Sequence, residues 1–289
     1  MPPMWYLMGP AKRWPLALAA VAATILAGCG GGGEAAPAPS TETTPATKPL
    51  RIIFPEGFTV REMGARVAAV RRIAIERRNV TPKLTRAGYV AAAARAQPPR
   101  AFRADWKRGS LEGFLFPAVY EFSQFSTGRQ LVADQLAAFR RAFAGVRLGY
   151  ARSKNLTPYD VLKIGSMIEK ETVLPRERRL VAAVIYNRLR ARMPLGIDAT
   201  IRYGLGIAGT ESLTKAAIAS DNPFNSRRFP GLPPTPIANP GLASIEAAAN
   251  PAPVDYRYYV RVPGTRRHFF TADESEFLRK VCEFGYACD

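Results

Sequence analysis

Two glutamates in the segment IGSMIEKETVLPRERR, residues 164–179, are the acidic side chains best placed for catalysis. A carboxyl group in apolar surroundings has a raised pKa and can donate a proton to a departing oxygen. At about 100° per residue, Glu169 and Glu171 lie about 80° to either side of the buried stripe of one helix. They therefore cannot serve one substrate as a pair. Because Arg178 is near Glu171 in the sequence, we expect these two residues to form an ordinary ion pair.

Glu169 is the stronger candidate of the two. Helical side chains lean toward the N-terminus, so Glu169 reaches back over Gly165 and Ser166, where side chains fill little volume. We expect a gap there that admits a sugar, with Leu162 as an apolar wall. Such a setting keeps a carboxyl protonated near neutrality. The alternative is that Glu169 is only a solvated residue at the edge of the helix.

The helix that must position Glu169 has a well-marked start. Thr157 is an N-cap residue, Pro158 suits the first helical position, and Asp160 completes a capping box. The residues that share one helical face, and so predict its buried stripe, are Val161, Ile164, Gly165, Ile168 and Thr172.

The first 48 residues carry targeting signals instead of a core. Lys12 and Arg13 precede an apolar stretch that ends in Leu-Ala-Gly-Cys, and this resembles a bacterial lipobox with Cys29 as the lipidated residue. We expect residues 1–28 to be a lipoprotein signal peptide and the Gly- and Pro-rich residues 29–48 to be a disordered tether. The alternative, a single-span anchor, predicts the same extracytoplasmic face of the cell membrane.

The net charge of the 289-residue chain is +18. Nucleic acid is the common partner of so basic a protein, but an exported chain does not meet the chromosome and no nucleic-acid motif is present. Anionic lipid head groups and acidic wall polymers are the expected partners. The alternative is that the basic side chains form only a solvated surface. Outside the cytoplasm Cys282 and Cys288 can form a disulfide in the tail, residues 282–289, or remain two free thiols.

The sequence after residue 48 predicts an α+β protein with two lobes. Residues 50–54 read as a strand, Thr59 and Glu62 cap a helix that runs to about Ile75, and a second helix covers about 84–96. With a strand and turn over residues 111–122, this is a small LysM-like N-terminal lobe, residues 49–122. A helix over about 127–143 opens the larger mixed α/β lobe, residues 123–281.

Long ordered motifs in this second lobe carry a family resemblance. The segments SMIEKET, VIYNRLRARMPLGIDATIRYG and GLPPTPIANPG resemble the YceG-like family of endolytic murein transglycosylases, and the similarity spans about residues 50–281. The resemblance implies that Glu169 is the catalytic acid. It also implies peptidoglycan glycan strands as substrate and cell-wall synthesis proteins as further partners. It implies no cofactor and no metal.

The implied reaction cleaves the β-1,4 bond between N-acetylmuramic acid and N-acetylglucosamine without water and leaves a 1,6-anhydro end. One carboxyl suffices, because the nucleophile is a hydroxyl of the substrate, whereas ordinary glycosidases use two carboxyls. Two alternatives stay open. One is a hydrolytic muramidase that uses Glu169 with Asp198 and water, and the other is a non-catalytic wall-binding lipoprotein.

The resemblance and the polar character of matching positions suggest further residues. Asp198 is expected to orient Glu169 or a sugar, or only to cap a helix, while the lone His268 is expected to be structural because the family's second histidine is Phe277 here. The PAVY segment at residues 117–120 departs from the family pattern. The predicted substrate-binding residues are Asn187, Arg188, Asp198, Thr200, Tyr203, Asn225 and Asn239.

Overall fold

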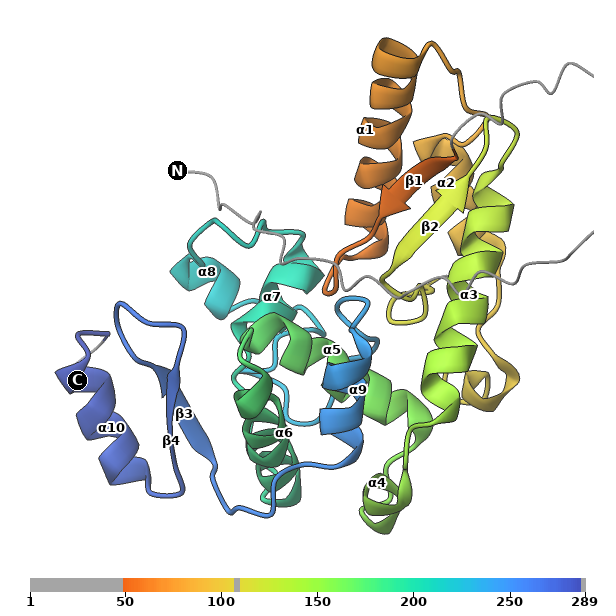
Figure 1. Cartoon of the computed structure of the whole chain (residues 1–289). Coiled ribbons are helices and arrows are strands. Elements are labelled where there is room, and N and C mark those ends of the chain that lie inside the picture. Colours follow the sequence, from red (N-terminus) through yellow and green to blue (C-terminus); the bar gives the residue numbers. More distant parts are fainter. Residues whose placement is uncertain (1–48, 107–109, 287–289) are drawn as a thin grey trace, which may run out of the picture. The chain divides into compact units, whose positions relative to one another are not determined.

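The computed structural model describes residues 49–106 and 110–286 (Figure 1). In the described residues, small two-stranded sheets accompany a predominantly helical fold. The elements are, in order, β1 (Leu50–Ile53), α1 (Val60–Arg78), α2 (Arg86–Arg95), the 3₁₀ turn η1 (Arg100–Phe102), β2 (Val119–Phe122), α3 (Gly128–Ala144), α4 (Gly149–Ser153), α5 (Pro158–Glu171), α6 (Pro175–Arg190), α7 (Asp198–Leu205), α8 (Lys215–Ile218), α9 (Leu242–Ala249), β3 (Tyr258–Arg261), β4 (His268–Thr271) and α10 (Glu274–Glu283). The expected mixture of helices and small sheets is therefore present.

The N-terminal lobe is built from β1, α1, α2 and β2. Thr59 and Glu62 form the predicted capping box of α1, and Asn79 ends this helix in the left-handed conformation. β1 and β2 pair in antiparallel register from Leu50 opposite Phe122. Only the last four residues of the segment 111–122 form a strand. The element order is that expected of a LysM-like lobe, and the LysM identity itself stays a prediction.

α3 links this lobe to the larger one. Its N-cap is Thr127 and its capping-box residue is Gln130, so the predicted helix over 127–143 is confirmed to within a residue. Phe139 lies on the buried face of α3 and packs against Phe102 and Phe114. These rings join α3 to the segment that follows α2 and make one continuous hydrophobic core.

α5 is the central helix of the larger lobe, and its predicted cap at Thr157 and Asp160 is confirmed. The residues of the predicted stripe are all buried. α9 crosses α5 closely at Gly165, since a Cβ atom added there would lie 3.4 Å from the Cα atom of Ile245. The start of α9 and the end of α5 are thereby held side by side (Figure 1).

The C-terminal hairpin and α10 complete the fold. β3 and β4 pair in antiparallel register, with Arg261 opposite His268, and α10 packs on both strands. None of the helices in residues 49–106 and 110–286 has the length and apolar composition that a membrane crossing needs. The lipobox at Cys29 and the proposed tether lie outside the described residues.

Candidate active site

Glu169 lies in the last turn of α5 with its side chain only 8% exposed. Its Oε2 atom accepts a hydrogen bond of 3.0 Å from the main-chain N–H of Gly241, at the N-terminus of α9. Its Oε1 atom is 4.0 Å from Nη2 of Arg178 on α6. An N–H group and a guanidinium are both hydrogen-bond donors, so each side-chain oxygen of Glu169 faces a donor group.

A tight turn of the N-terminal lobe covers the other side of Glu169. Gly57 has a φ of +77°, and a Cβ atom there would lie 3.4 Å from Cγ of Glu169. The turn is fixed because the Gly57 N–H donates to the carbonyl of Asn239 and its carbonyl accepts from Nζ of Lys170. Glu169 is thus enclosed by the Gly57 turn, the start of α9 and Arg178 of the next helix.

The expected gap over Gly165 and Ser166 is not open, so this prediction is wrong. Both residues are buried, because the α9 backbone around Ile245 packs directly on Gly165. The Ser166 hydroxyl donates to the carbonyl of Lys163 and accepts from the N–H of Ile237. The missing side-chain volume therefore serves helix packing, and a substrate must approach Glu169 from elsewhere.

A second carboxylate, Glu56, lies beside Glu169 and was not foreseen. Its carboxylate occupies the space into which a Cβ atom on Gly241 would project, so it rests against the residue that donates to Glu169. Glu56 is an exposed residue, but partial burial of its carboxyl raises its pKa, the charge of Glu169 raises the pKa further, and the charge of Arg178 opposes this. The only local signal is the Pro-Glu-Gly turn ahead of α1, and no helical periodicity connects that turn with α5.

Arg178 serves Glu169 and not Glu171, so the predicted Glu171–Arg178 pair is wrong. Nε of Arg178 donates to the hydroxyl of Ser244 at 3.1 Å, which directs this arginine toward α9. Glu171 instead accepts a hydrogen bond of 2.7 Å from the hydroxyl of Tyr259 on β3. Burial raises the pKa of Glu171, and this hydrogen bond opposes the shift. The helical wheel correctly separated the two glutamates but did not reveal their partners.

His268 forms a buried pair with Glu177 next to Glu171. Nδ1 of His268 is 2.7 Å from Oε2 of Glu177, and its main-chain N–H donates to Oε1 at 3.1 Å. The Thr172 hydroxyl donates to the same carboxylate. The contacts tie β4 to α6 and agree with the structural role that was expected for His268.

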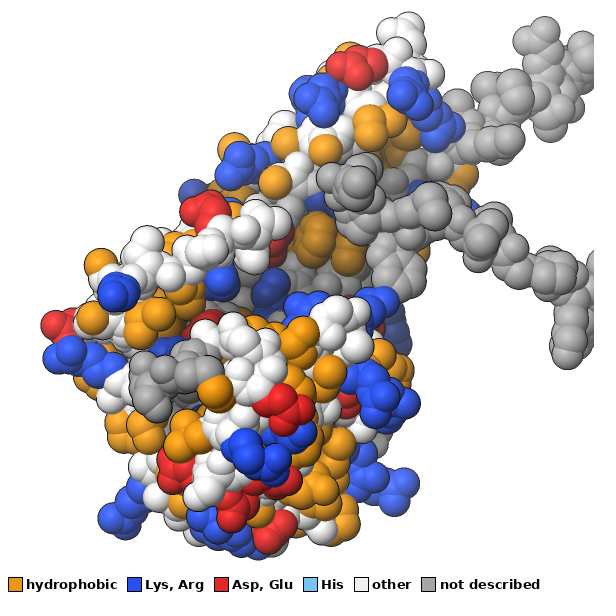
Figure 2. Space-filling model, turned by 90° about the vertical axis from the view of Figure 1, so that its left-hand side faces the viewer, with side chains coloured by type: hydrophobic (Ala, Val, Ile, Leu, Met, Phe, Trp, Pro, Cys, Tyr) orange, Lys and Arg blue, Asp and Glu red, His pale blue; other side chains and the backbone are white. Residues whose placement is uncertain are grey.

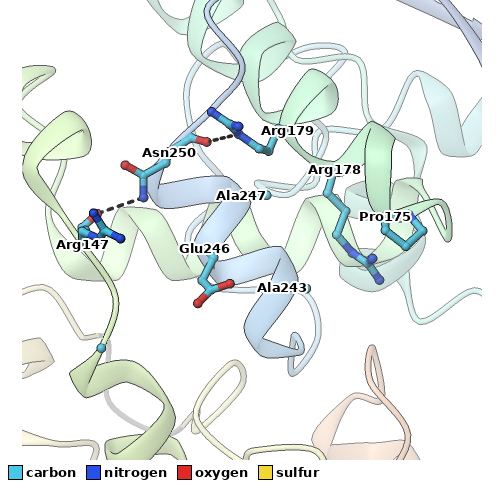
Figure 3. Close-up of a pocket in the computed structure, with 9 residues that line it drawn as sticks. Arg147, Pro175, Arg178, Arg179, Ala243, Glu246, Ala247 and Asn250 are labelled. Carbon is cyan, nitrogen blue, oxygen red and sulfur yellow. Dashed lines mark hydrogen bonds between the residues drawn. The ribbon is translucent and has the colours of Figure 1, made fainter.

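A polar groove begins at Arg178 and follows α9. It is a cavity of about 670 Å³ whose lining includes Arg147, Arg178, Arg179, Glu246 and Asn250. Figure 3 shows Arg178 on one wall and Glu246 on the exposed side of α9, with Asn250 at the end of that helix. Charged and amide side chains of this kind can hydrogen-bond the hydroxyl and acetamido groups of a sugar.

Four of the predicted substrate-binding residues are buried, and their polar atoms are engaged within the protein. The side-chain amides of Asn187, Asn225 and Asn239 donate to main-chain carbonyl groups. The Thr200 hydroxyl donates to the carbonyl of Ile197. These contacts hold loops in place, which is a positioning role instead of the substrate contact that was expected.

The remaining three predicted residues lie nearer the surface. Arg188 donates from Nε to the carbonyl of Arg257, and Tyr203 donates to the buried carboxylate of Glu112. Asp198 accepts from Nε of Arg227 at 2.7 Å and makes no side-chain cap of α7. The charge of Asp198 acts on Glu171. Glu56, and not Asp198, is therefore the acidic neighbour of Glu169.

Residues 49–106 and 110–286 contain no cluster of three or more histidine, cysteine, aspartate or glutamate side chains able to hold a metal ion. Cys282 takes part in a disulfide bond. Its predicted partner Cys288 lies outside the described residues.

Comparisons with known proteins identify relatives of this chain. Two relatives, from Streptococcus pneumoniae strain R6 and Bacillus subtilis strain 168, are each named endolytic murein transglycosylase. The first is 34% identical over 61% of this chain and 32% of its own length, and the second is 33% identical over 52% of this chain and 41% of its own length. The chain thus matches only about a third to two-fifths of these relatives.

A solved structure gives the same result at the level of the fold. The crystal structure of a yceG-like protein from Listeria monocytogenes matches with a TM-score of 0.64 and 27% identity, over 80% of this chain and 75% of that one. The model of the YceG-like family matches residues 38–283, which includes every element described above. The chain therefore belongs to the YceG-like family.

Proposed function

We propose that the protein is a lytic transglycosylase that cleaves peptidoglycan strands internally, with Glu169 as its catalytic acid and base. The names of its relatives support peptidoglycan as the substrate class, and the geometry of the site supports Glu169 as the catalytic residue. The observation that carries the proposal is the nearly buried Glu169 carboxyl, which is held by Gly241 and Arg178 where a polar groove begins.

In this proposal Glu169 first protonates the glycosidic oxygen between N-acetylmuramic acid and N-acetylglucosamine. The resulting carboxylate is stabilised by the Gly241 N–H and the Arg178 guanidinium. Glu169 then takes the proton from the C6 hydroxyl of the muramic sugar as this oxygen attacks C1. The C1–O bond to the leaving sugar breaks, a 1,6-anhydro ring forms, and Glu169 is protonated again without consumption of water.

Glu56 favours a hydrolytic muramidase as the second candidate. A hydrolase needs a second carboxylate that activates water or attacks the sugar, and Glu56 is an acid beside Glu169. Glu56 and Glu169 rest against the same residue, Gly241, and so do not face each other across a wide cleft. This arrangement makes the single-acid mechanism our first choice.

Mass spectrometry of digested peptidoglycan separates the two candidates. A transglycosylase product is lighter by one water than a hydrolase product. We expect the wild type to give the anhydro product, Glu169→Gln to give none, and Glu56→Gln to retain it. A hydrolytic product that disappears in Glu56→Gln would establish the second candidate. Exposed Glu76, on α1, supplies the matched control Glu76→Gln.

We also propose that a lipid on Cys29 holds the protein at the extracytoplasmic face of the cell membrane, where it meets nascent strands and cell-wall synthesis proteins. The lipobox motif and the +18 charge support this location. Metabolic labelling with a clickable fatty acid should mark the wild type and not Cys29→Ser. Equal labelling of both would refute the anchor.

A further inference from the structure

A second cavity includes Lys170, the residue that follows Glu169 in α5, in its lining. Its volume is about 780 Å³, and the elements that line it are α1, α2, α7 and the 110–112 turn. The lining is mostly apolar and made of small side chains, among them Val60, Ala87, Val90, Ala94, Ala199 and Ile207. Val90 is 39% exposed, so an apolar side chain faces the cavity without a protein partner to cover it fully.

Basic side chains surround this apolar surface. Arg61, Arg86, Lys170 and Arg202 line the cavity, and the first two are exposed at the first turns of α1 and α2. The acids in the lining are occupied, because Glu62 is bound in the capping box of α1 and Glu112 is buried in hydrogen bonds. Basic groups spread widely over the face in Figure 2. The cavity therefore suits an anionic ligand with small apolar groups.

Lys170 connects the cavity with the surroundings of Glu169. Lys170 lines the cavity, and its Nζ donates to the carbonyl of Gly57, which lies against Glu169. An extended peptide covers about 3.3–3.6 Å per residue. A peptide of three to five residues attached to a sugar at Glu169 therefore reaches roughly 10–18 Å from that sugar.

We propose that this cavity binds the stem peptide of the glycan strand that is cut at Glu169. Such peptides carry methyl side chains from alanine and several free carboxylates. The methyl groups match the small apolar lining, and the carboxylates match Arg61 and Arg86, which can form bidentate hydrogen bonds with them. This inference rests on the proposed function and deepens it, because it makes peptide-bearing strands the preferred substrate over bare glycan.

Paired digests test the inference. The full-length protein digests two substrates in parallel. One is purified glycan strands that bear tetrapeptides, and the other is the same strands after an amidase has removed the peptides. We expect the wild type to cleave peptide-bearing strands at least tenfold faster. The double variant Arg61→Glu, Arg86→Glu should bring the ratio of the two rates close to one. Acidic residues suit first helical turns, so this variant should fold, and circular dichroism checks that it does.

The control Arg77→Glu lies in the last turn of α1, outside the cavity, and should keep the wild-type ratio. Equal wild-type rates on both substrates, or a double variant that keeps the preference, would overturn the inference and leave the proposed function intact. Absence of cleavage of either substrate by the wild type would instead overturn the proposed function.

Discussion

Glu112 gives the sharpest prediction about stability. Its side chain is buried in the turn before β2 and joins the lobes, because it accepts hydrogen bonds from the N–H of Val60, the amide of Asn239 and the hydroxyl of Tyr203. Burial raises its pKa to about 8, and the hydrogen bonds from Val60 and Tyr203 only partly oppose the shift. Replacement with the neutral and nearly isosteric glutamine removes the titration.

The sign and size of the effect follow from linkage. The unfolded chain releases the Glu112 proton near pH 4.5, whereas the folded protein holds it up to about pH 8. Between these values the folded state binds one more proton, so the free energy of unfolding falls as pH rises. Each pKa unit corresponds to 1.36 kcal/mol, so the wild type should lose about 3 kcal/mol between pH 5 and pH 7 through this group alone.

Urea unfolding at pH 5, 6 and 7 measures this loss. The difference in unfolding free energy between Glu112→Gln and the wild type should shift by about 3 kcal/mol in favour of the variant as pH rises from 5 to 7. The exposed Glu76 again supplies the control, and Glu76→Gln should show no such trend. A difference for Glu112→Gln that stays constant with pH would refute the assignment of a neutral buried carboxyl.

Two further substitutions, each with a matched control, test contacts between distant elements of the fold. Gly128→Ala would place a Cβ atom 2.6 Å from the α2 backbone and should lower the free energy of unfolding by about 2 kcal/mol or more. The control Gly149→Ala meets nothing within 4 Å, so its free energy of unfolding should stay within about 1 kcal/mol of wild type. Urea unfolding measures both. Tyr259→Phe removes the hydrogen bond to Glu171 and should cost about 1–3 kcal/mol, unlike a Tyr286→Phe control at an exposed position. Equal stability within either pair would contradict the packing described here.

The sequence predicted the elements that local signals mark. The capping boxes at Thr59 and Thr157 appear where expected, since they depend on side chains within one turn. Helix α3 begins within a residue of its predicted start. The segment 111–122 was predicted less well. Gly113, with a φ of +91°, and the tight packing around it produce turns up to residue 118, so only β2 is a strand. Helix α10 was not foreseen.

The candidate site was predicted only in part, because its geometry depends on contacts between distant segments. A helical wheel identified the empty face at Gly165 but not the α9 backbone that fills it. It separated Glu169 from Glu171 correctly, yet it could not show that Arg178 and Glu56 approach the first of them. The family resemblance and the polar side chain suggested that Asn239 binds substrate, whereas the structure uses its amide to join the two lobes.

The central claim is that Glu169 alone shuttles the proton in a cleavage that consumes no water. The most direct test is mass spectrometry of peptidoglycan digested in parallel by the wild type and Glu169→Gln, with water labelled with oxygen-18. We expect unlabelled 1,6-anhydro ends from the wild type and no product from the variant. Labelled reducing ends from the wild type, or undiminished cleavage by the variant, would contradict it.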